Sequence, residues 1–344
     1  MYRVKGGVRV TLLFAILVLA VIFVNGWTDA PNAIAGCVAS RAMNVREAVV
    51  MAGICNALGA LSASLIGARV AETVFSIVDF GQNKRVALGC ISAAMVAVVI
   101  FSTVAFFFGI PTSESHALMA GIVGAALGGS MQMSSVDIKY IGVVLFGLIF
   151  STLPSYYISR WIYSIILEVC SSLDRRRTLR YFMRAQKIGA ASSAFLHGAQ
   201  DSQKFVGVLM LGFSMRSHEI GTESFNAPIF LSLACAAVMT LGTLCGGGRI
   251  IKKVGDKMVR LDAAAGTSSD IGASITLVAC TLLGIPVSTT HAKTCAMMGA
   301  GSLTHRGVDR SVVKEMLVAW LITFPCCALL GFVIGYFFQK GGLL

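Results

Sequence analysis

The sequence has few charged residues for its length. Only 13% of the 344 residues are Asp, Glu, Lys or Arg, 56% are apolar, and the mean hydropathy is +0.81. Soluble domains usually carry about 25% charged residues. Several uncharged stretches reach the roughly 20 residues that a helix needs to cross the hydrocarbon core. They lie at 10–28, 48–68, 86–113, 140–159, 227–248, 271–290 and 316–339. This pattern excludes a soluble fold and predicts an all-α integral membrane protein.

Two familiar motifs are also missing. The ten cysteines are scattered, mostly within apolar runs, and none forms a CxxC pair that would suggest a metal clip. Such cysteines usually serve as small buried hydrophobes. The first apolar run follows Lys5 and Arg9 but reaches Asn25 without a small-residue cleavage site. We therefore expect it to be retained rather than removed as a signal peptide.

Basic residues outnumber acidic ones and give a formal net charge of +12. They gather between the apolar runs, above all in 171–187 and 247–262. Short loops rich in Lys and Arg remain on the cytoplasmic side of a membrane. The charge therefore indicates topology, with both segments cytoplasmic in a multi-pass protein of the cell membrane, and we expect no nucleic-acid partner.

The chain contains two pairs of similar motifs. They are NGWTDAPNA at 25–33 with HGAQDSQK at 197–204, and GIPTSESHA at 109–117 with GIPVSTTHA at 284–292. Asp201 follows Asp29 at nearly the same offset along the chain as that at which Pro286 follows Pro111. A nearly constant offset in two unlike motifs, in the same order, indicates that the chain is duplicated.

We expect about five membrane spans in each copy. They lie at 8–40, 48–68, 86–110, 111–130 and 138–166, and then at 188–215, 227–246, 263–284, 286–303 and 311–338. We expect the first span of each copy to be broken at its aspartate motif. An odd number of spans means that the second copy enters the membrane in the opposite orientation. The expected organisation is a first transmembrane repeat at 1–170, a basic cytoplasmic linker at 171–187 and an inverted repeat at 188–344. Both termini are then extracytoplasmic.

Asp29 and Asp201 are candidate functional residues because each lies within an apolar segment. A charged side chain at membrane depth costs about 2.5–3.5 kcal/mol on insertion scales. In inverted-repeat transporters, broken helices and re-entrant hairpins meet around a central site near the midplane. A structural ion pair is the alternative for one aspartate alone, but repetition in both halves favours function. Lys204 either pairs with Asp201 or contacts an anion.

The second pair of motifs supplies hydroxyl groups, from Thr112, Ser113, Ser115, Ser288, Thr289 and Thr290. Proline ends the preceding helix in each motif, and Ser or Thr can cap a new helix whose first N–H groups favour an anion. Ordinary capping is the structural alternative. His116 and His291 either coordinate a ligand, relay protons or make packing hydrogen bonds. Glu114, which has Thr as its counterpart, is either functional or interfacial.

These motifs resemble the paired signatures of the inorganic phosphate transporter (PiT) family, commonly GxNDxANA and HGANDAQK. The hydroxyl-rich turns resemble the family's PVSSSHA and PVSTTHA elements, and the resemblance covers nearly the whole chain. It implies a secondary active transporter that carries inorganic phosphate by cation-coupled symport, with sodium or protons as the cation. It implies no cofactor apart from bound sodium. Symport of another oxyanion, with sulfate first, is the alternative.

The resemblance also implies the site. Anion contacts are implied for Ser113, Ser115, Ser288, Thr289, Thr290, Gln203, Lys204 and Gln200. Coupling-ion contacts are implied for Asp29, Asp201, Asn32, Thr28 and Asn56, of which Asn56 could equally make a helix–helix hydrogen bond. His116, His291 and Glu114 are further candidates. Thr28 and Gln200 stand where the family usually has Asn, which leaves the coupling ion open. The implied partners are phosphate, sodium ions or protons and the lipid bilayer, and a homodimer is left open.

Other function classes fit less well. A channel would show a continuous polar stripe, whereas the polar clusters of this sequence are confined to two motifs per half. The pairs Ser113–His116 and Ser288–His291 could suggest a hydrolase, but nothing resembles a nucleophile elbow. We therefore predict that the protein is not an enzyme. Carboxylates could accept the proton of hydrogen phosphate, which favours phosphate over sulfate.

Overall fold

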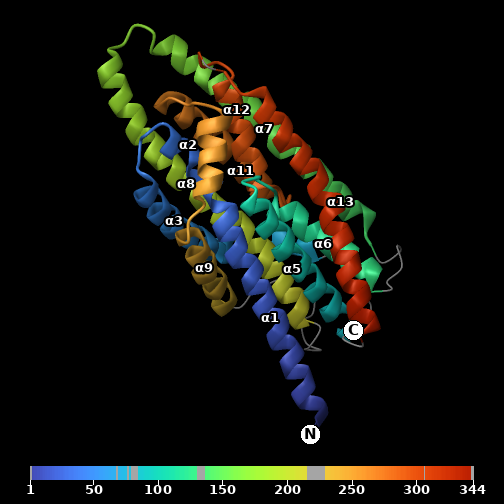
Figure 1. Cartoon of the computed structure of the whole chain (residues 1–344). Helices are drawn as coiled ribbons and strands as arrows, with labels where there is room; N and C mark the ends of the chain where they lie inside the picture. Colours follow the sequence, from blue (N-terminus) through green and yellow to red (C-terminus); the bar gives the residue numbers. More distant parts are fainter. Residues whose placement is uncertain are drawn as a thin grey trace.

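The protein is almost entirely helical. The computed structural model describes residues 2–66, 69–75, 77–78, 84–129, 136–214, 229–305 and 307–341. Its helices, labelled in Figure 1, are α1 (Tyr2–Thr28), α2 (Ala30–Ala39), α3 (Val45–Ile66), α4 (Arg69–Phe75), α5 (Lys84–Phe107), α6 (Glu114–Gly128), α7 (Ile138–Val169), α8 (Arg175–Ser214), α9 (Ile229–Leu244), α10 (Gly248–Ile251), the π-helical η2 (Lys252–Met258), α11 (Ala263–Leu283), α12 (Thr289–Gly301) and α13 (Arg310–Lys340). Each expected span corresponds to one of these helices, or to α1 and α2 together.

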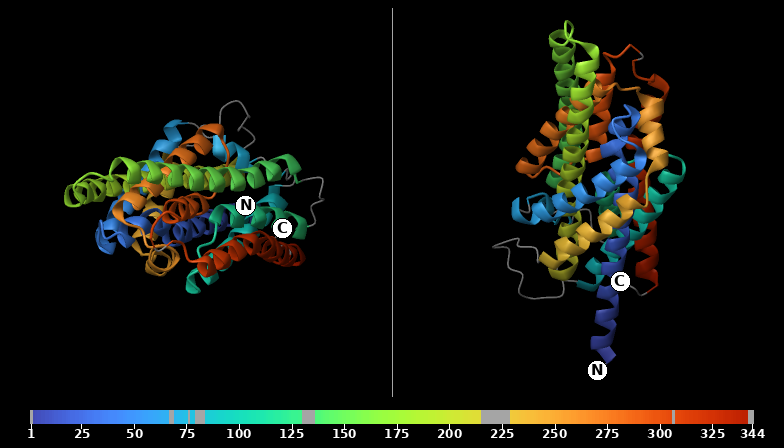
Figure 2. Two further views of the ribbon diagram at one scale, coloured as in Figure 1. Left: turned by 90° about the horizontal axis from the view of Figure 1, so that it is seen from above. Right: turned by 90° about the vertical axis from the view of Figure 1, so that its left-hand side faces the viewer.

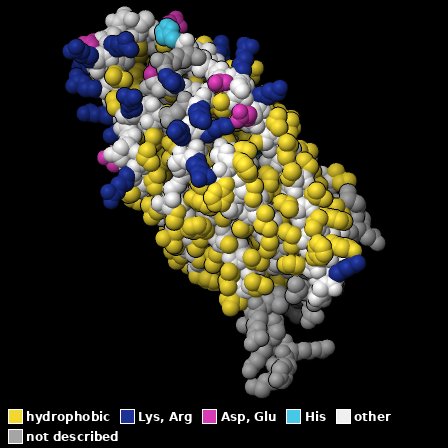
Figure 3. Space-filling view, viewed as in Figure 1, with side chains coloured by type: hydrophobic (Ala, Val, Ile, Leu, Met, Phe, Trp, Pro, Cys, Tyr) yellow, Lys and Arg dark blue, Asp and Glu magenta, His cyan; other side chains and the backbone are white. Residues whose placement is uncertain are grey.

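Six helical stretches of the described chain are long and apolar enough to cross a membrane, and α9 with α10 and η2 makes a seventh if that bent pair is one span. Large apolar side chains cover the sides of the molecule, for example Leu321 at 74% exposure and Trp161 at 65%. Lys and Arg side chains instead gather at one end, where α7 turns into α8 (Figure 3). We call this the linker end. The prediction of an all-α membrane protein is confirmed.

Both termini lie at the end of the molecule opposite the α7–α8 turn (Figure 2). This is the arrangement expected for an odd number of crossings before the turn and an odd number after it. The segment expected to be extracytoplasmic at 216–226 lies outside the described residues.

Equivalent helices of the two sequence copies pack reciprocally. Helix α1 packs against α9 while α3 packs against α8, and α6 packs against α13 while α12 packs against α7. In the same way, α5 contacts α13 and α11 contacts α7. Interior prolines also match, Pro154 in α7 and Pro325 in α13.

Glycines allow the helices to approach closely at these contacts. A Cβ atom on Gly26 would lie 2.2 Å from the carbonyl oxygen of Met239, and one on Gly198 would lie 2.2 Å from that of Asn56. Small residues let helix backbones approach closely inside membranes. Because Gly26 and Gly198 belong to the two aspartate motifs, these contacts hold both motifs at the centre of the helix bundle.

The prediction of a broken helix is wrong for the second motif. Helix α8 runs for 40 residues without interruption through His197–Lys204. Its motif contains no proline, and Gly198 serves close packing rather than a break. In the first copy only Asp29 separates α1 from α2, where Pro31 in the first turn of α2 has no N–H to donate. The two helices still form one span-length stretch, Leu12–Ala39.

Helices α6 and α12 are too short to be spans. They have 15 and 13 residues, which is about 20 Å at 1.5 Å per residue, against a hydrocarbon core of about 30 Å. Each follows a long helix and begins inside the protein, with Ser113 and Ser288 as N-caps. The expectation that the segments 111–130 and 286–303 are spans is therefore not met, because each is too short to cross the membrane on its own.

Candidate functional site

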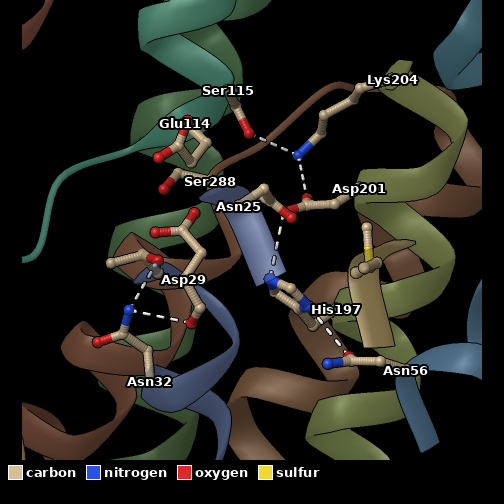
Figure 4. A network of polar contacts seen from close by, with 12 residues as sticks. Asn25, Asp29, Asn32, Asn56, Glu114, Ser115, His197, Asp201, Lys204 and Ser288 are labelled. Carbon is tan, nitrogen blue, oxygen red and sulfur yellow. Dashed lines mark hydrogen bonds and ion pairs between the residues drawn. The ribbon is translucent and has the colours of Figure 1, made fainter. Parts of the chain in front are cut away.

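The two pairs of motifs meet in one buried polar network (Figure 4). It draws on the end of α1, the start of α2, the middle of α3 and α8, and the first turns of α6 and α12. Every residue that the sequence nominated for the site is buried. We call the following residues the central network: Asn25, Thr28, Asp29, Asn32, Asn56, Glu114, Ser115, His197, Asp201, Lys204 and Thr290.

Lys204 links the second aspartate motif to both hydroxyl-rich turns. Its Nζ atom lies 2.6 Å from Oδ1 of Asp201, 2.6 Å from Oγ of Ser115 and 2.7 Å from the carbonyl oxygen of Val287. A lysine ammonium has three donors, and all three are used here. Lys204 therefore pairs with Asp201, as one of its two interpretations predicts, and it also contacts a hydroxyl-rich turn.

The other oxygen of Asp201 has two neighbours. Asn25 donates to Oδ2 from Nδ2 at 2.9 Å, and Nε2 of His197 lies 3.3 Å from the same atom. Nδ1 of His197 in turn lies 3.0 Å from Oδ1 of Asn56, and Nδ2 of Asn56 donates to Oγ1 of Thr243 at 3.1 Å. Asn56 thus joins the network through a helix–helix hydrogen bond.

The first aspartate motif faces carboxylates rather than amines. Ligand atoms of Asp29, His197 and Asp201 all lie within 4.8 Å of one another, which is a geometry that can hold a cation. Thr28 donates to Oε1 of Glu114 at 3.0 Å, and Figure 4 shows the Asp29 carboxylate directed toward Glu114. Of the two interpretations left open for Glu114, the interfacial one does not hold, because its side chain is buried inside the network.

The charges of this network do not balance. Asp29, Glu114 and Asp201 are three buried carboxylates, and Lys204 with His197 supplies at most two positive charges among the described neighbours. An unpaired buried charge is costly. A bound proton or cation would offset the excess of negative charge, and oxygen ligands of this kind suit a hard cation.

The hydroxyl-rich turns bring two helix N-termini together. Ser113 caps α6 by accepting from the His116 amide at 3.3 Å, and Ser288 caps α12 by accepting from the His291 amide at 3.2 Å. The rings of His116 and His291 are 5.0 Å apart. Helix N-termini carry free N–H groups and a partial positive charge, so this meeting point favours an anion.

Several polar atoms beside these turns have no hydrogen-bond partner among the described residues. They are both side-chain atoms of Gln200, both ring nitrogens of His291, Oγ1 of Thr289, Oδ1 of Asn32 and Oε2 of Glu114. Buried polar groups are normally hydrogen-bonded. Because these atoms are fully buried, they are candidates to contact a bound ion or water.

Two predicted residues behave differently from the rest. Gln203 accepts from the amide of Val70 at 3.3 Å and thus holds the first turn of α4 rather than the network. His291 packs on Trp320, with ring centroids 3.9 Å apart. By contrast, Asn32 donates to Thr290 at 3.1 Å and joins the first aspartate motif to α12.

Sequence reasoning missed Asn25, His197 and the backbone carbonyl of Val287. A signal for the first two was present, because Asn25 and His197 each lie one helical turn before the aspartate of their own motif. The carbonyl of Val287 carries no sequence signal, because any residue at this position supplies one.

A mostly helical fold with membrane-spanning helices and a charged site inside it defines an integral membrane protein with a buried cluster of ionisable groups. A family model described as the phosphate transporter family matches residues 25–331. The chain belongs to this family.

Curated relatives are similar in sequence to this chain over nearly its full length. A protein of Bacillus subtilis named "probable low-affinity inorganic phosphate transporter" is 31% identical over 95% of this chain and 96% of its own. A protein of Rhizobium meliloti with the same name is 33% identical over 93% of this chain and 94% of its own. A solved structure described as "the sodium-dependent phosphate transporter" superposes with a TM-score of 0.80, at 20% identity, and covers 96% of this chain and 99% of its own. These relatives are transporters, and the structural likeness confirms the fold.

Proposed function

We propose that this protein is a secondary transporter that carries inorganic phosphate across the membrane together with a cation, either sodium or a proton. One observation carries the proposal. Lys204 bonds to Ser115, in the first turn of α6, and to Asp201, in the carboxylate-rich part of the network. An anion-binding region and a cation-binding region therefore share one buried site. Family membership and the names of the relatives support phosphate as the anion.

Phosphate would bind between the first turns of α6 and α12. The hydroxyls of Ser115 and Thr289, the free N–H groups of both helices and the ammonium of Lys204 are its donors. Lys204 would exchange part of its contact with the Val287 carbonyl for a phosphate oxygen. Charge-assisted hydrogen bonds of this kind are roughly twice as strong as neutral ones.

The coupling cation would bind among the carboxylates. Asp29 and Asp201 supply oxygens within 4.8 Å of each other, and Asn32 has a free Oδ1 atom. A cation here offsets the negative charge of phosphate as well as that of the carboxylates. Each ion therefore favours binding of the other, and this coupling is reciprocal by thermodynamic linkage. Symport results when the site can switch the side of the membrane to which it opens only while it is empty or fully loaded.

The carboxylates also favour phosphate over sulfate. Hydrogen phosphate has a proton to donate, and Oε2 of Glu114 is a buried acceptor with no partner in the described structure. Sulfate has no proton at neutral pH, so its oxygens would face a carboxylate without a hydrogen bond between them. The repulsion selects against sulfate.

The reciprocal packing supports an inverted repeat, with a first repeat at 1–170, a linker at 171–187 and a second repeat at 188–344. Swapping the two copies maps the main contacts onto one another, for example α1 with α9 onto α8 with α3. A two-fold relation between the copies has this property. The hairpins α5–α6 and α11–α12 then enter from opposite sides as re-entrant elements. The positive-inside rule makes the basic linker end cytoplasmic. Both termini are then extracytoplasmic, although Arg3, Lys5 and Arg9 at the N-terminus run against this rule.

Uptake of labelled phosphate and labelled sulfate into proteoliposomes tests the proposal. A sodium gradient and a proton gradient are imposed separately, and an ionophore removes each gradient as the control. We expect concentrative phosphate uptake with one gradient and little sulfate uptake with either. Uptake that is equal with and without a gradient would reject coupling, and faster uptake of sulfate than of phosphate would reject the substrate.

A further inference from the structure

A second buried ion pair lies outside all the sequence motifs of the site. Nζ of Lys293, in α12, contacts Oδ1 of Asp270, in α11, and Oγ of Ser193, in α8, lies 3.4 Å from both atoms. All three side chains are 3% exposed or less. Burying two charges costs several kcal/mol per ion, so a buried pair is weak grounds for stability.

Unpartnered polar atoms accompany this pair. Oδ2 of Asp270 and Nε2 of Gln186 have no hydrogen-bond partner among the described residues, and both side chains are at most 1% exposed. Gln186 lies two turns before Ser193 on α8, nearer the linker end, and its amide packs against Gly266, one turn before Asp270. A donor and an acceptor are thus available to a ligand.

The pair lies in line with polar side chains of α8. Gln186, Ser193, His197 and Asp201 are spaced by seven, four and four residues, which places them on one face of α8. Lys293 follows Thr290 of the central network by three residues, or about 4.5 Å along α12. We call Gln186, Ser193, Asp270 and Lys293 the linker-side cluster. It connects the central network with the basic end of the protein.

The equivalent positions of the first copy are apolar. The two copies are aligned by matching Asp29 with Asp201 in the first part of each copy and Pro111 with Pro286 in the later part. The counterparts of Gln186, Ser193, Asp270 and Lys293 are then Phe14, Val21, Met95 and Leu118, and all four belong to one buried hydrophobic core. An ion in the central network therefore meets hydrogen-bonding groups toward the linker end and hydrocarbon toward the other end. The duplication itself does not require this difference.

We propose that Lys293 is a second binding station for the phosphate anion, between the central network and the linker end, with Asp270 as its resting partner. The proposal rests on the proposed function. Phosphate takes the place of Asp270 on the ammonium and accepts further hydrogen bonds from Ser193 and Gln186. Asp270 then recaptures Lys293 as the anion leaves. A station on a transport path must bind an ion and also release it, and the competing carboxylate provides the release.

The test separates this role from that of a structural ion pair. The variant Asp270→Asn with Lys293→Gln replaces the pair by two amides that can bond to each other. We measure the melting temperature, phosphate binding to the purified protein and phosphate uptake in proteoliposomes. We expect unchanged folding and unchanged affinity at the central site, with uptake about tenfold slower or worse. Lys293→Arg, which keeps the cation, should retain most of the uptake.

Lys253 and Glu315 provide the matched control. They form an ion pair at the same end of the protein, but it is partly exposed. Neutralising both, by Lys253→Gln with Glu315→Gln, should leave uptake unchanged, since surface pairs contribute little. Wild-type uptake of phosphate in the same vesicles tests the proposed function itself. If the wild type is active and the neutral Asp270–Lys293 variant is equally fast, the second station is rejected.

A second variant leaves the ion pair intact. Gln186→Met with Ser193→Ala removes two donors of the linker-side cluster without exposing a buried charge. We expect several-fold slower uptake and unchanged phosphate affinity, because the central network is not altered. Uptake at the wild-type rate would overturn the proposal even if the neutral pair failed to fold.

Discussion

Asn25 and His197, which occupy equivalent positions in the two aspartate motifs, approach the same carboxylate oxygen, Oδ2 of Asp201. The duplicated motifs therefore do not form two separate sites. The first motif supplies an amide to the aspartate of the second, and Asp201 acquires a full set of partners, including Lys204. Asp29 faces Glu114 and Asp201 instead. Equivalent aspartates thus have different surroundings, and we expect different consequences from mutating them.

Replacing Asp29 should abolish transport without harming the fold. Asp29→Asn keeps the size of the side chain and removes one of three buried negative charges, which relieves repulsion in the empty protein. We expect a melting temperature equal to or above that of the wild type. Uptake of phosphate should fall at least about tenfold, because the coupling cation loses a ligand.

Normal uptake by purified Asp29→Asn protein would remove this residue from the site. The conservative Asp29→Glu is the companion variant, since it keeps the charge but changes its reach. A cation site with matched distances predicts an altered cation affinity in Asp29→Glu rather than unchanged transport.

Replacing Lys204 should harm both stability and transport. Lys204→Gln leaves Asp201 buried without its cation, and breaking a buried pair costs about 3–5 kcal/mol. Adding Asp201→Asn removes the stranded charge and should restore the melting temperature. Transport should stay lost in the double variant, because phosphate has lost its ammonium. Recovery of uptake together with stability would show that the pair is only structural.

Much of the central network could be predicted from the sequence, because each motif interrupts an apolar run. A buried charge or hydroxyl cluster in such a run is conspicuous, and repetition with a nearly constant offset indicates duplication. Asp29, Asp201, Lys204 and Ser115 were found in this way. The continuity of α8 could not be predicted, because glycine both weakens a helix and permits close packing. Only the neighbouring helix shows which role Gly198 has.

The linker-side cluster was not predicted for a related reason. Asp270 and Lys293 lie on different helices and lack a repeated counterpart. The interpretation that polar clusters are confined to the motifs is therefore wrong. Glu114 is the intermediate case. Its position beside a motif could be read from the sequence, but its contact with Thr28 depends on how α6 packs against the end of α1.

Helix packing can be tested at Gly198. An added Cβ atom would lie 2.2 Å from the Asn56 carbonyl oxygen, so α3 and α8 must separate in Gly198→Ala. We expect a loss of about 1–3 kcal/mol or more in stability and loss of transport, because the His197–Asn56 contact is disturbed. Gly142→Ala in α7 is the matched control, since nothing lies within 4 Å of its added Cβ atom. Equal melting temperatures for the two variants would contradict the packing.

The proposed topology predicts opposite accessibility for the linker and the C-terminus. In a cysteine-depleted background, Ser171→Cys lies at the α7–α8 turn and Gly341→Cys just after α13. A membrane-impermeant thiol reagent added to intact cells should label only the second. The first should react only after the cells are permeabilised. Labelling of both residues in intact cells would reject an odd number of crossings between them.

The last prediction concerns the coupling ion. Thr28 and Gln200 stand where the PiT family usually has Asn. Thr28 uses its hydroxyl to donate to Glu114, and the amide of Gln200 has no partner among the described residues. A sodium site requires several oxygens at short and matched distances, whereas proton coupling requires only a titratable carboxylate. We expect Thr28→Asn with Gln200→Asn to increase the sodium dependence of uptake. The measurement is the initial rate of phosphate uptake against sodium concentration at fixed pH, with each single variant alongside. If wild-type uptake already requires sodium, and the double variant leaves its sodium affinity unchanged, these two positions do not determine the coupling ion.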